Sequence, residues 1–138
     1  MKNKQKSINS LIALTQEYDT LPQSLVSKVS INGTMFNGIW DTGSAVTAVS
    51  ESVARKLGLV SLGAVPQNTA NGTRLANNYL INISIIMGNK GMFFDDVSVL
   101  DANMNSVDML IGMDIITKGD FAIRTCDGKT IMSFAVGG

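Results

Sequence analysis

The residues of this chain that could carry out chemistry are its carboxylates, because the chain offers few other reactive side chains. The 138 residues include no histidine and a single cysteine, Cys126. Without histidine the chain has no Ser-His-Asp triad, no Cys-His pair and no histidine-based zinc site. A single cysteine excludes an intrachain disulfide and a Cys-x-x-Cys metal site. If the chain is a hydrolase, Asp or Glu residues are the natural candidates for its chemistry.

The most informative carboxylate is Asp41, which lies in the run Ile39-Trp40-Asp41-Thr42-Gly43-Ser44-Ala45. It follows an apolar segment and is flanked by hydroxyl groups and a glycine, a setting that can hold a tuned acid or base. An ordinary turn at the end of a strand uses the same residue types for local hydrogen bonds. Asp-Thr-Gly also arises by chance. The motif alone therefore leaves a catalytic acid and a structural turn both open.

The elements that must position Asp41 are short strands separated by turns. Alternating apolar residues predict a strand over 25–31. Asn32-Gly33 follows, the strongest short signal for a hairpin turn, so a returning strand is expected over 34–40. Further strands are expected over 45–50, 79–87, 92–100 and 107–111, with a last hairpin from 121–124 and 130–134. Short helices are expected over 51–57, capped by Ser50, and over 113–118. This pattern is typical of an all-β fold.

Length and composition fit one folded domain. Hydrophobic residues make up 45% of the chain, and eleven basic residues balance eleven acidic ones, so no nucleic-acid partner is expected. Residues 1–24 are predicted to be a flexible N-terminal arm or a pro-segment, with a helical turn near Ile8 to Glu17, and residues 25–138 are predicted to be the domain. No apolar run reaches the ~18 residues of a membrane span, and no convincing signal peptide is present. A cytoplasmic protein with no membrane partner is expected.

Three elements, in this order, resemble the retropepsins, the single-domain aspartic proteases typified by retroviral proteases and their bacterial-type relatives. The first is the strand leading into Asp41-Thr42-Gly43-Ser44-Ala45, with the helix that follows it. The second is the hairpin over residues 69–73, at the place of the family's flap. The third, Met109-Leu110-Ile111-Gly112, looks like the family's hydrophobic-hydrophobic-Gly element and is followed by a helix. The resemblance extends over roughly residues 25–135.

The resemblance implies a retropepsin-like closed β-barrel with a flap hairpin and one or two short helices, acting as a homodimer. Aspartic proteases use two carboxylates that share one proton around a water molecule. This chain has one Asp-Thr-Gly, so a second Asp41 must come from a second chain across a two-fold axis. The implied activity is that of an aspartic endopeptidase acting on a peptide or protein substrate, with no cofactor and no metal.

Residue roles follow from the same resemblance, with Asp41 as the catalytic acid and base. The residues expected to support the active site are Thr42, Gly43, Ser44 and Gly112. The residues expected to bind substrate are Ala45 and, at the flap tip, Ala70, Asn71 and Gly72. The Asn-Gly turn is also compatible with an ordinary exposed hairpin.

Particular roles are expected for individual residues around Asp41. Thr42 is expected to bond across the dimer axis, and Gly43 to let the backbone approach the carboxylates. A side chain at Gly112 is expected to block packing against the Asp41 loop. The Ser44 hydroxyl is expected to donate to Asp41 and to favour its ionised form, which predicts a more acidic working range than alanine would give. Asp114 is interpreted as a carboxylate that favours a helix N-terminus, without a catalytic role.

The chain departs from the retroviral pattern at Met113, where those enzymes usually have an arginine that ties the dimer together. The C-terminal run 130–136 is expected to supply strands to an intersubunit sheet instead. The alternative function is a catalytically silent retropepsin-like module for dimerisation or peptide binding. A glycosidase would need two distinct acids at a set separation, and no second acid is paired with Asp41 in the sequence. Four apolar residues are compatible either with substrate subsites or with the core: Ile83, Ile85, Val107 and Met109.

Overall fold

The computed structural model describes residues 12–19 and 22–137 of the chain. In this part there are ten strands and two short helices, α2 (Glu51–Lys56) and α3 (Met113–Ile116). The strands are β1 (Ile12–Tyr18), β2 (Val26–Ile31), β3 (Thr34–Trp40), β4 (Ala48–Ser50), β5 (Gly63–Thr69), β6 (Gly72–Met87), β7 (Lys90–Ala102), β8 (Met109–Ile111), β9 (Asp120–Cys126) and β10 (Lys129–Val136). The all-β expectation is confirmed.

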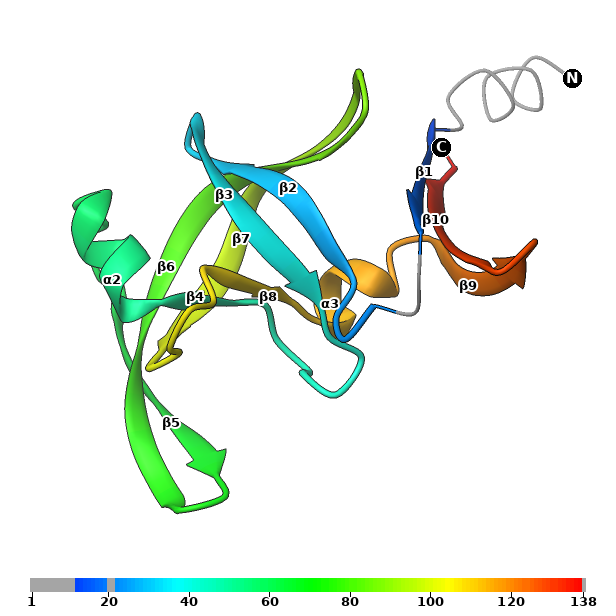
Figure 1. Cartoon of the computed structure of the whole chain (residues 1–138). Coiled ribbons are helices and arrows are strands. Elements are labelled where there is room, and N and C mark those ends of the chain that lie inside the picture. The colour runs from blue at the N-terminus through cyan, green and yellow to red at the C-terminus, as the bar shows by residue number, and fades with distance from the viewer. Residues whose placement is uncertain (1–11, 20–21, 138) are drawn as a thin grey trace, which may run out of the picture.

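Six strands close into a barrel, in agreement with the expected fold. The strand order β2-β3-β8-β4-β7-β6 is completed by pairing of β2 with β6 (Figure 1). Most neighbours are antiparallel, but β3 pairs with β8 and β4 pairs with β7 in parallel. Beyond the barrel, β5 pairs only with the first part of β6, so these two strands form a hairpin that projects from it.

Local sequence explains several of these elements. Asn32 and Gly33 both have positive φ, +49° and +91°, as the tight turn between β2 and β3 requires. The Ser50 hydroxyl accepts a hydrogen bond from the Val53 amide at 3.1 Å, which caps α2 at its N-terminus. Both the turn and the cap were predicted. The expected strand over 45–50 is shorter, because only residues 48–50 pair as β4.

The barrel interior is filled by the inward-facing side chains of its strands. Ile83, Ile85 and Met109, which the sequence left between subsites and core, are at most 1% exposed and belong to the core. Alternate residues of β2 and β6 are buried, as a sheet with one face on a core requires.

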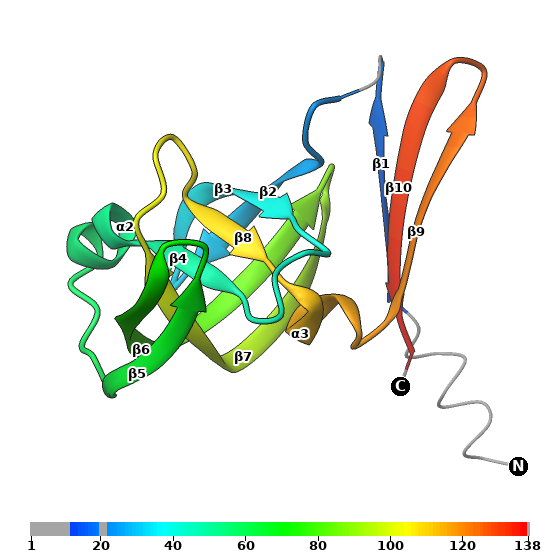
Figure 2. The same ribbon diagram turned by 90° about the horizontal axis from the view of Figure 1, so that it is seen from below.

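The N- and C-terminal strands form a separate three-stranded sheet in the order β1-β10-β9, which stands beside the barrel (Figure 2). The helical turn expected near Ile8 to Glu17 is therefore wrong over residues 12–17, which belong to strand β1. Residues 1–11 lie outside the described residues, so a flexible arm before β1 stays a prediction. The partners of β1 are more than a hundred residues away in sequence, which explains why local patterning did not reveal it.

Trp40 joins this sheet to the barrel. Its ring lies 5.3 Å from that of Phe121 and 5.1 Å from that of Phe134, measured between centroids. The indole Nε1 donates to Ser27 Oγ at 2.9 Å, and the Ser27 hydroxyl donates to Gln16 Oε1 of β1 at 2.8 Å. The residue that directly precedes Asp41 is thus held by both the barrel and the terminal sheet.

Candidate active site

Asp41 and Gly112 are brought together by the parallel pairing of β3 and β8. Trp40 lies opposite Ile111 in this register, so the next residue of each strand, Asp41 and Gly112, leaves the sheet at the same edge. The Asp41 amide donates to the Ile111 carbonyl at 2.9 Å and extends the pairing by one residue. Two segments about seventy residues apart in sequence therefore meet at the carboxylate.

The turn after β3 orients the Asp41 side chain. Asp41 is half-buried, and its Oδ1 accepts a hydrogen bond from the Gly43 amide at 2.9 Å. No donor among the described residues bonds to Oδ2, which leaves that oxygen available to a ligand. The Ser44 amide donates to the Asp41 carbonyl at 3.2 Å and closes the turn. One carboxylate oxygen is thus fixed by the backbone and the other is free.

The predicted hydrogen bond from the Ser44 hydroxyl to Asp41 is wrong. Ser44 Oγ donates to the Val46 carbonyl at 2.7 Å and stabilises the chain that follows the turn. The expected acidic shift of the working range therefore loses its structural basis.

Gly112 is buried against the segment that carries Asp41. A Cβ atom built on Gly112 would lie 2.8 Å from the Ser44 carbonyl oxygen and from the Val46 carbonyl carbon. Its φ of −92° is open to any residue, so space rather than backbone conformation demands glycine here. The next amide, that of Met113, donates to the Ser44 carbonyl at 2.7 Å and holds the two segments in contact.

Asp114 has a structural role that sequence analysis missed. One of its oxygens, Oδ1, accepts the Thr47 hydroxyl at 2.7 Å, and the Thr47 backbone amide donates to both carboxylate oxygens at 3.0 and 3.1 Å. The Thr47 hydroxyl in turn accepts the Gly112 amide at 3.1 Å. Asp114 therefore ties the end of the Asp41 segment to α3. No local pattern indicates this bond, because its partners are 67 residues apart.

The side of the Asp41 turn that faces outward is open and largely apolar. Thr42 is exposed and lines a recess of about 470 Å³ together with residues of α3 and the start of β9. The apolar lining of this recess comes from Met113, Ile116 and Phe121. The recess adjoins Thr42, the residue that is predicted from the sequence to lie at the dimer axis.

The residues expected to bind substrate lie in two separate places. Ala45 is exposed in the segment after the Asp41 turn, whereas Ala70, Asn71 and Gly72 are exposed at the tip of the β5–β6 hairpin. No hydrogen bond among the described residues joins the hairpin tip to the Asp41 segment. Thr69 Oγ1 accepts the Asn71 amide and donates to the Gly72 carbonyl, so the tip is a self-contained turn.

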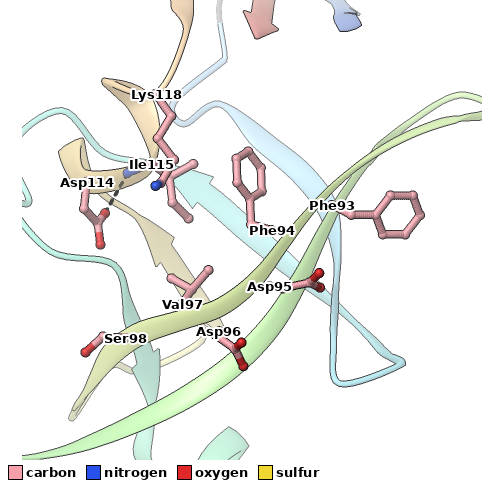
Figure 3. Close-up of a pocket in the computed structure, with 9 residues that line it drawn as sticks. All are labelled: Phe93, Phe94, Asp95, Asp96, Val97, Ser98, Asp114, Ile115 and Lys118. Atoms are coloured by element: carbon pink, nitrogen blue, oxygen red, sulfur yellow. Dashed lines mark hydrogen bonds between the residues drawn. The ribbon is translucent and has the colours of Figure 1, made fainter. Parts of the chain in front are cut away.

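A second cavity, of about 490 Å³, lies next to α3 but does not belong to the Asp41 site. Figure 3 shows Asp114, Ile115 and Lys118 on one side of it and residues 93–98 of β7 on the other. None of residues 41–47 lines it. Within the described residues, no group of three or more His, Cys, Asp or Glu side chains is placed to hold a metal ion.

Comparison with known proteins identifies the class of this fold and site. The profile of the family described as gag-polyprotein putative aspartyl protease matches residues 27–118, a span that includes Asp41, the β5–β6 hairpin and Gly112. The chain belongs to this family of retropepsin-like aspartic proteases. None of the curated proteins matches it.

One solved structure with a TM-score above 0.5 supports the fold. The retropepsin-like aspartic protease from Rickettsia conorii superposes with a TM-score of 0.62 at 19% identity, covering 94% of this chain and 97% of that one. The protease of Simian Foamy Virus (mac) is similar at a TM-score of 0.49 and 16% identity, covering 67% of this chain and 92% of that one. The 94% coverage extends the likeness to the bacterial protein beyond the barrel.

No helix in the described part of the chain is long and apolar enough to cross a membrane.

Proposed function

We propose that the chain is an aspartic endopeptidase that hydrolyses peptide bonds with two Asp41 carboxylates, one from each subunit of a homodimer. The observation that carries this proposal is the setting of Asp41. Its carboxylate is half-buried, oriented by the Gly43 amide and free at Oδ2. Gly112 packs tightly against Ser44 and Val46, in the segment that carries this carboxylate.

The mechanism follows from the proximity of two like charges. When two carboxyl groups share one site, only one ionises readily and the other keeps its proton. The ionised Asp41 removes a proton from a water molecule, which attacks the peptide carbonyl carbon. The protonated Asp41 donates to the carbonyl oxygen, and proton transfer to the nitrogen then releases the amine product. Neither step needs a cofactor.

The open recess beside Thr42 supports the homodimer. Thr42 is exposed next to the partly exposed apolar side chains of Met113 and Phe121, which a second copy would cover. Apolar contact of this kind would compensate for the arginine that Met113 replaces, because burial of apolar area stabilises association without ion pairing. In this arrangement Thr42 bonds across the two-fold axis.

The projecting β5–β6 hairpin is proposed to act as the flap. Its exposed tip, residues 70–72, would close over a peptide bound between the hairpin and Asp41. Ala45, exposed beside the Asp41 turn, would contact the bound peptide from below. Closure would exclude bulk water from the two carboxylates.

Peptide cleavage by the full-length protein tests the activity. A peptide library is incubated with wild-type protein and with Asp41→Asn at acidic and neutral pH, and products are identified by mass spectrometry. Asp41→Asn is expected to lose cleavage by about 10³-fold or more, because the amide cannot remove a proton from water. A confirmed dimer that cleaves no peptide under any condition would favour the silent binding module.

Subunit mixing tests whether two copies of Asp41 act together. Increasing amounts of dimer-forming Asp41→Asn protein are added to a fixed amount of wild-type protein and allowed to exchange. At equal amounts, random pairing leaves about half of the original activity, since mixed dimers have one acid. Activity that is unchanged by the variant, while exchange is demonstrated by mass spectrometry, would contradict the shared site.

A further inference from the structure

The buried carboxylate of Asp101, at the end of β7, lies where the β5–β6 hairpin leaves the barrel. The ladder between β6 and β7 ends at the pair Asn78 and Leu100. From Asn77 to the tip, β6 pairs only with β5, and all but one residue of β5 is exposed. Beyond Asn78 the barrel ladder therefore supplies no backbone partner to the hairpin.

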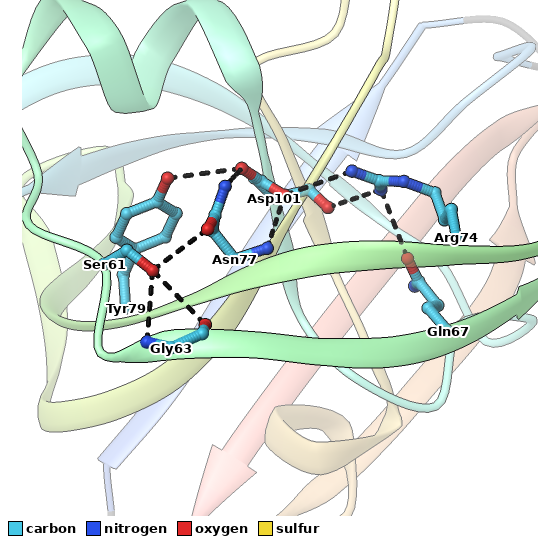
Figure 4. A network of polar contacts seen from close by, with 7 residues as sticks. All are labelled: Ser61, Gly63, Gln67, Arg74, Asn77, Tyr79 and Asp101. Atoms are coloured by element: carbon cyan, nitrogen blue, oxygen red, sulfur yellow. Dashed lines mark hydrogen bonds and ion pairs between the residues drawn. The ribbon is translucent and has the colours of Figure 1, made fainter.

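Asp101 provides the hydrogen-bond acceptors at the point where the β6–β7 ladder ends (Figure 4). The next amide of β6, that of Asn77, donates to Asp101 Oδ1 at 3.0 Å in place of a backbone carbonyl. The Asn77 side-chain Nδ2 and the Tyr79 hydroxyl donate to Oδ2 at 3.1 and 3.2 Å. Asp101 is only 3% exposed, so these bonds replace the water that its carboxylate would otherwise contact.

Arg74 extends the same contact toward the hairpin tip. Its Nη2 donates to Asp101 Oδ1 at 3.2 Å, and its Nη1 donates to the Asp101 backbone carbonyl at 2.9 Å. Nη1 also approaches Gln67 Oε1 of β5 at 3.3 Å. One guanidinium group therefore links both strands of the hairpin to Asp101, in the forked geometry that arginine provides.

The base of the hairpin is bound to the same network. Ser61 donates to the Asn77 side-chain oxygen at 3.0 Å and accepts the Gly63 amide at 3.1 Å, which ties the start of β5 to β6. At its other side, Asp101 pairs with Val49 of β4, the strand that continues from the Asp41 segment. The network thus connects the hairpin to the part of the sheet that carries Asp41.

The charge of Asp101 suits this contact. Burial acts to raise the pKa of Asp101, but hydrogen bonds from Asn77, Tyr79 and Arg74 outweigh burial and hold it below the usual value. Burial raises the pKa of Tyr79, and the neighbouring Asp101 charge raises it further, so Tyr79 remains a donor. Glu51 and Arg55 of α2 line a pocket together with Asn77, Tyr79 and Asp101.

We propose that Asp101 is a positioning residue that fixes the β5–β6 hairpin relative to the Asp41 segment through Arg74, Asn77 and Tyr79. It does not touch the reacting atoms. Its consequence for catalysis rests on the proposed endopeptidase function, whereas its effect on the hairpin does not. Loss of the contact frees the hairpin to swing about the end of the β6–β7 ladder, which weakens substrate binding.

Hydrogen exchange of the full-length protein measures the hairpin directly. In Asp101→Asn, amides of residues 63–77 are expected to exchange about tenfold faster, because breaking a charged, buried contact favours local opening. Amides of the barrel strands β2 and β8 are expected to keep their wild-type rates. Equal rates in the hairpin, or a uniform increase over the whole barrel, would overturn the proposal.

Arg74→Met provides a second variant that keeps the core intact, since Arg74 is half-buried and Asp101 retains its other donors. It should speed hairpin exchange in the same region, and Arg74→Lys should restore only part of the protection, because lysine lacks the fork. Arg124→Met, at an exposed position of β9, is the matched control and should have no effect on the hairpin. Hairpin exchange that is the same in Arg74→Met and Arg124→Met would contradict the proposal.

Kinetics distinguishes this proposal from the proposed function. Arg74→Met is expected to raise KM about five- to tenfold with a smaller change in kcat, because the hairpin binds substrate and the carboxylates are untouched. Asp41→Asn should abolish cleavage and leave hairpin exchange at the wild-type rate. If the wild-type protein cleaves nothing, the proposed function fails while the exchange data still decide the role of Asp101. A fall in kcat with unchanged KM in Arg74→Met would contradict hairpin positioning.

Discussion

Replacement of Gly112 by alanine is the most direct perturbation of the Asp41 site that leaves Asp41 itself in place. The added Cβ would lie 2.8 to 2.9 Å from three backbone atoms of Ser44 and Val46. Backbone atoms cannot rotate away as the end of a flexible side chain can. Relief therefore requires the Asp41 segment to move away from β8 by roughly 0.5 Å to reach ordinary contact distance.

The expected cost follows from this geometry. Overpacking of a tight site costs about 1–3 kcal/mol. With a urea m-value of about 1–3 kcal/mol per M, the unfolding midpoint of Gly112→Ala should fall by on the order of 1 M. Because a misplacement of about 1 Å can cost ~10²-fold in rate, a shift half as large is expected to lower kcat by about tenfold.

The assay uses the only tryptophan of the chain, Trp40, which directly precedes Asp41. Urea unfolding is monitored by its fluorescence, and kcat is measured on a peptide that the wild-type protein cleaves. Gly91→Ala is the matched control, since a Cβ at Gly91 would meet nothing closer than 3.7 Å. If Gly112→Ala matches Gly91→Ala in both midpoint and kcat, the inferred contact behind the Asp41 segment is refuted.

Three further outcomes can be measured. Asp114→Ala leaves the amide and hydroxyl of Thr47 without their acceptor, so it should lose about 2–4 kcal/mol in urea unfolding; a wild-type midpoint would contradict this role. Leu14→Ala in β1, where the side chain is 1% exposed, should cost about 3 kcal/mol, whereas the exposed neighbour Thr15→Ala should cost little; equal midpoints would show that β1 is dispensable. The lowered pKa of Asp101 means that its contribution to stability is complete above the unfolded value of about 3.9 and is lost as pH falls through the folded value. The amide hydrogen-exchange rates of the hairpin, corrected for the intrinsic effect of pH, should therefore stay constant from pH 7 to about 5. A marked increase within that window would contradict an ionised Asp101 that holds the hairpin.

Local sequence signals correctly predicted the structural features that depend only on neighbouring residues. Asn32-Gly33 specifies a turn because both residues adopt positive φ, and Ser50 specifies a helix start because its hydroxyl reaches an amide three residues on. The strand expected over 34–40 has the same bounds as β3. These features depend on backbone conformation and on side chains within one turn of chain.

The strand β1, which depends on distant partners, was not predicted. The β1 strand has Leu14 on the face turned to the barrel, but the next inward residue is the polar Gln16, so its alternation is weak in sequence. Gln16 is accommodated because Ser27 and Val26 satisfy its side-chain amide. Only pairing with β10 makes the segment a strand.

The same distinction holds for the site. The sequence by itself determined which acid is the candidate, since the absence of histidine, the run around Asp41 and the later Gly112 limit the chemistry and the family. It did not determine where the polar residues form bonds: Ser44 bonds away from Asp41, Asp114 holds Thr47, and the hairpin is held by Asp101. Residue types set the chemistry that is available, whereas the bonds of Asp114 and Asp101 join segments that only the folded sheet brings together. The tertiary structure therefore decided how Asp41 is supported and which residues contact the base of the hairpin.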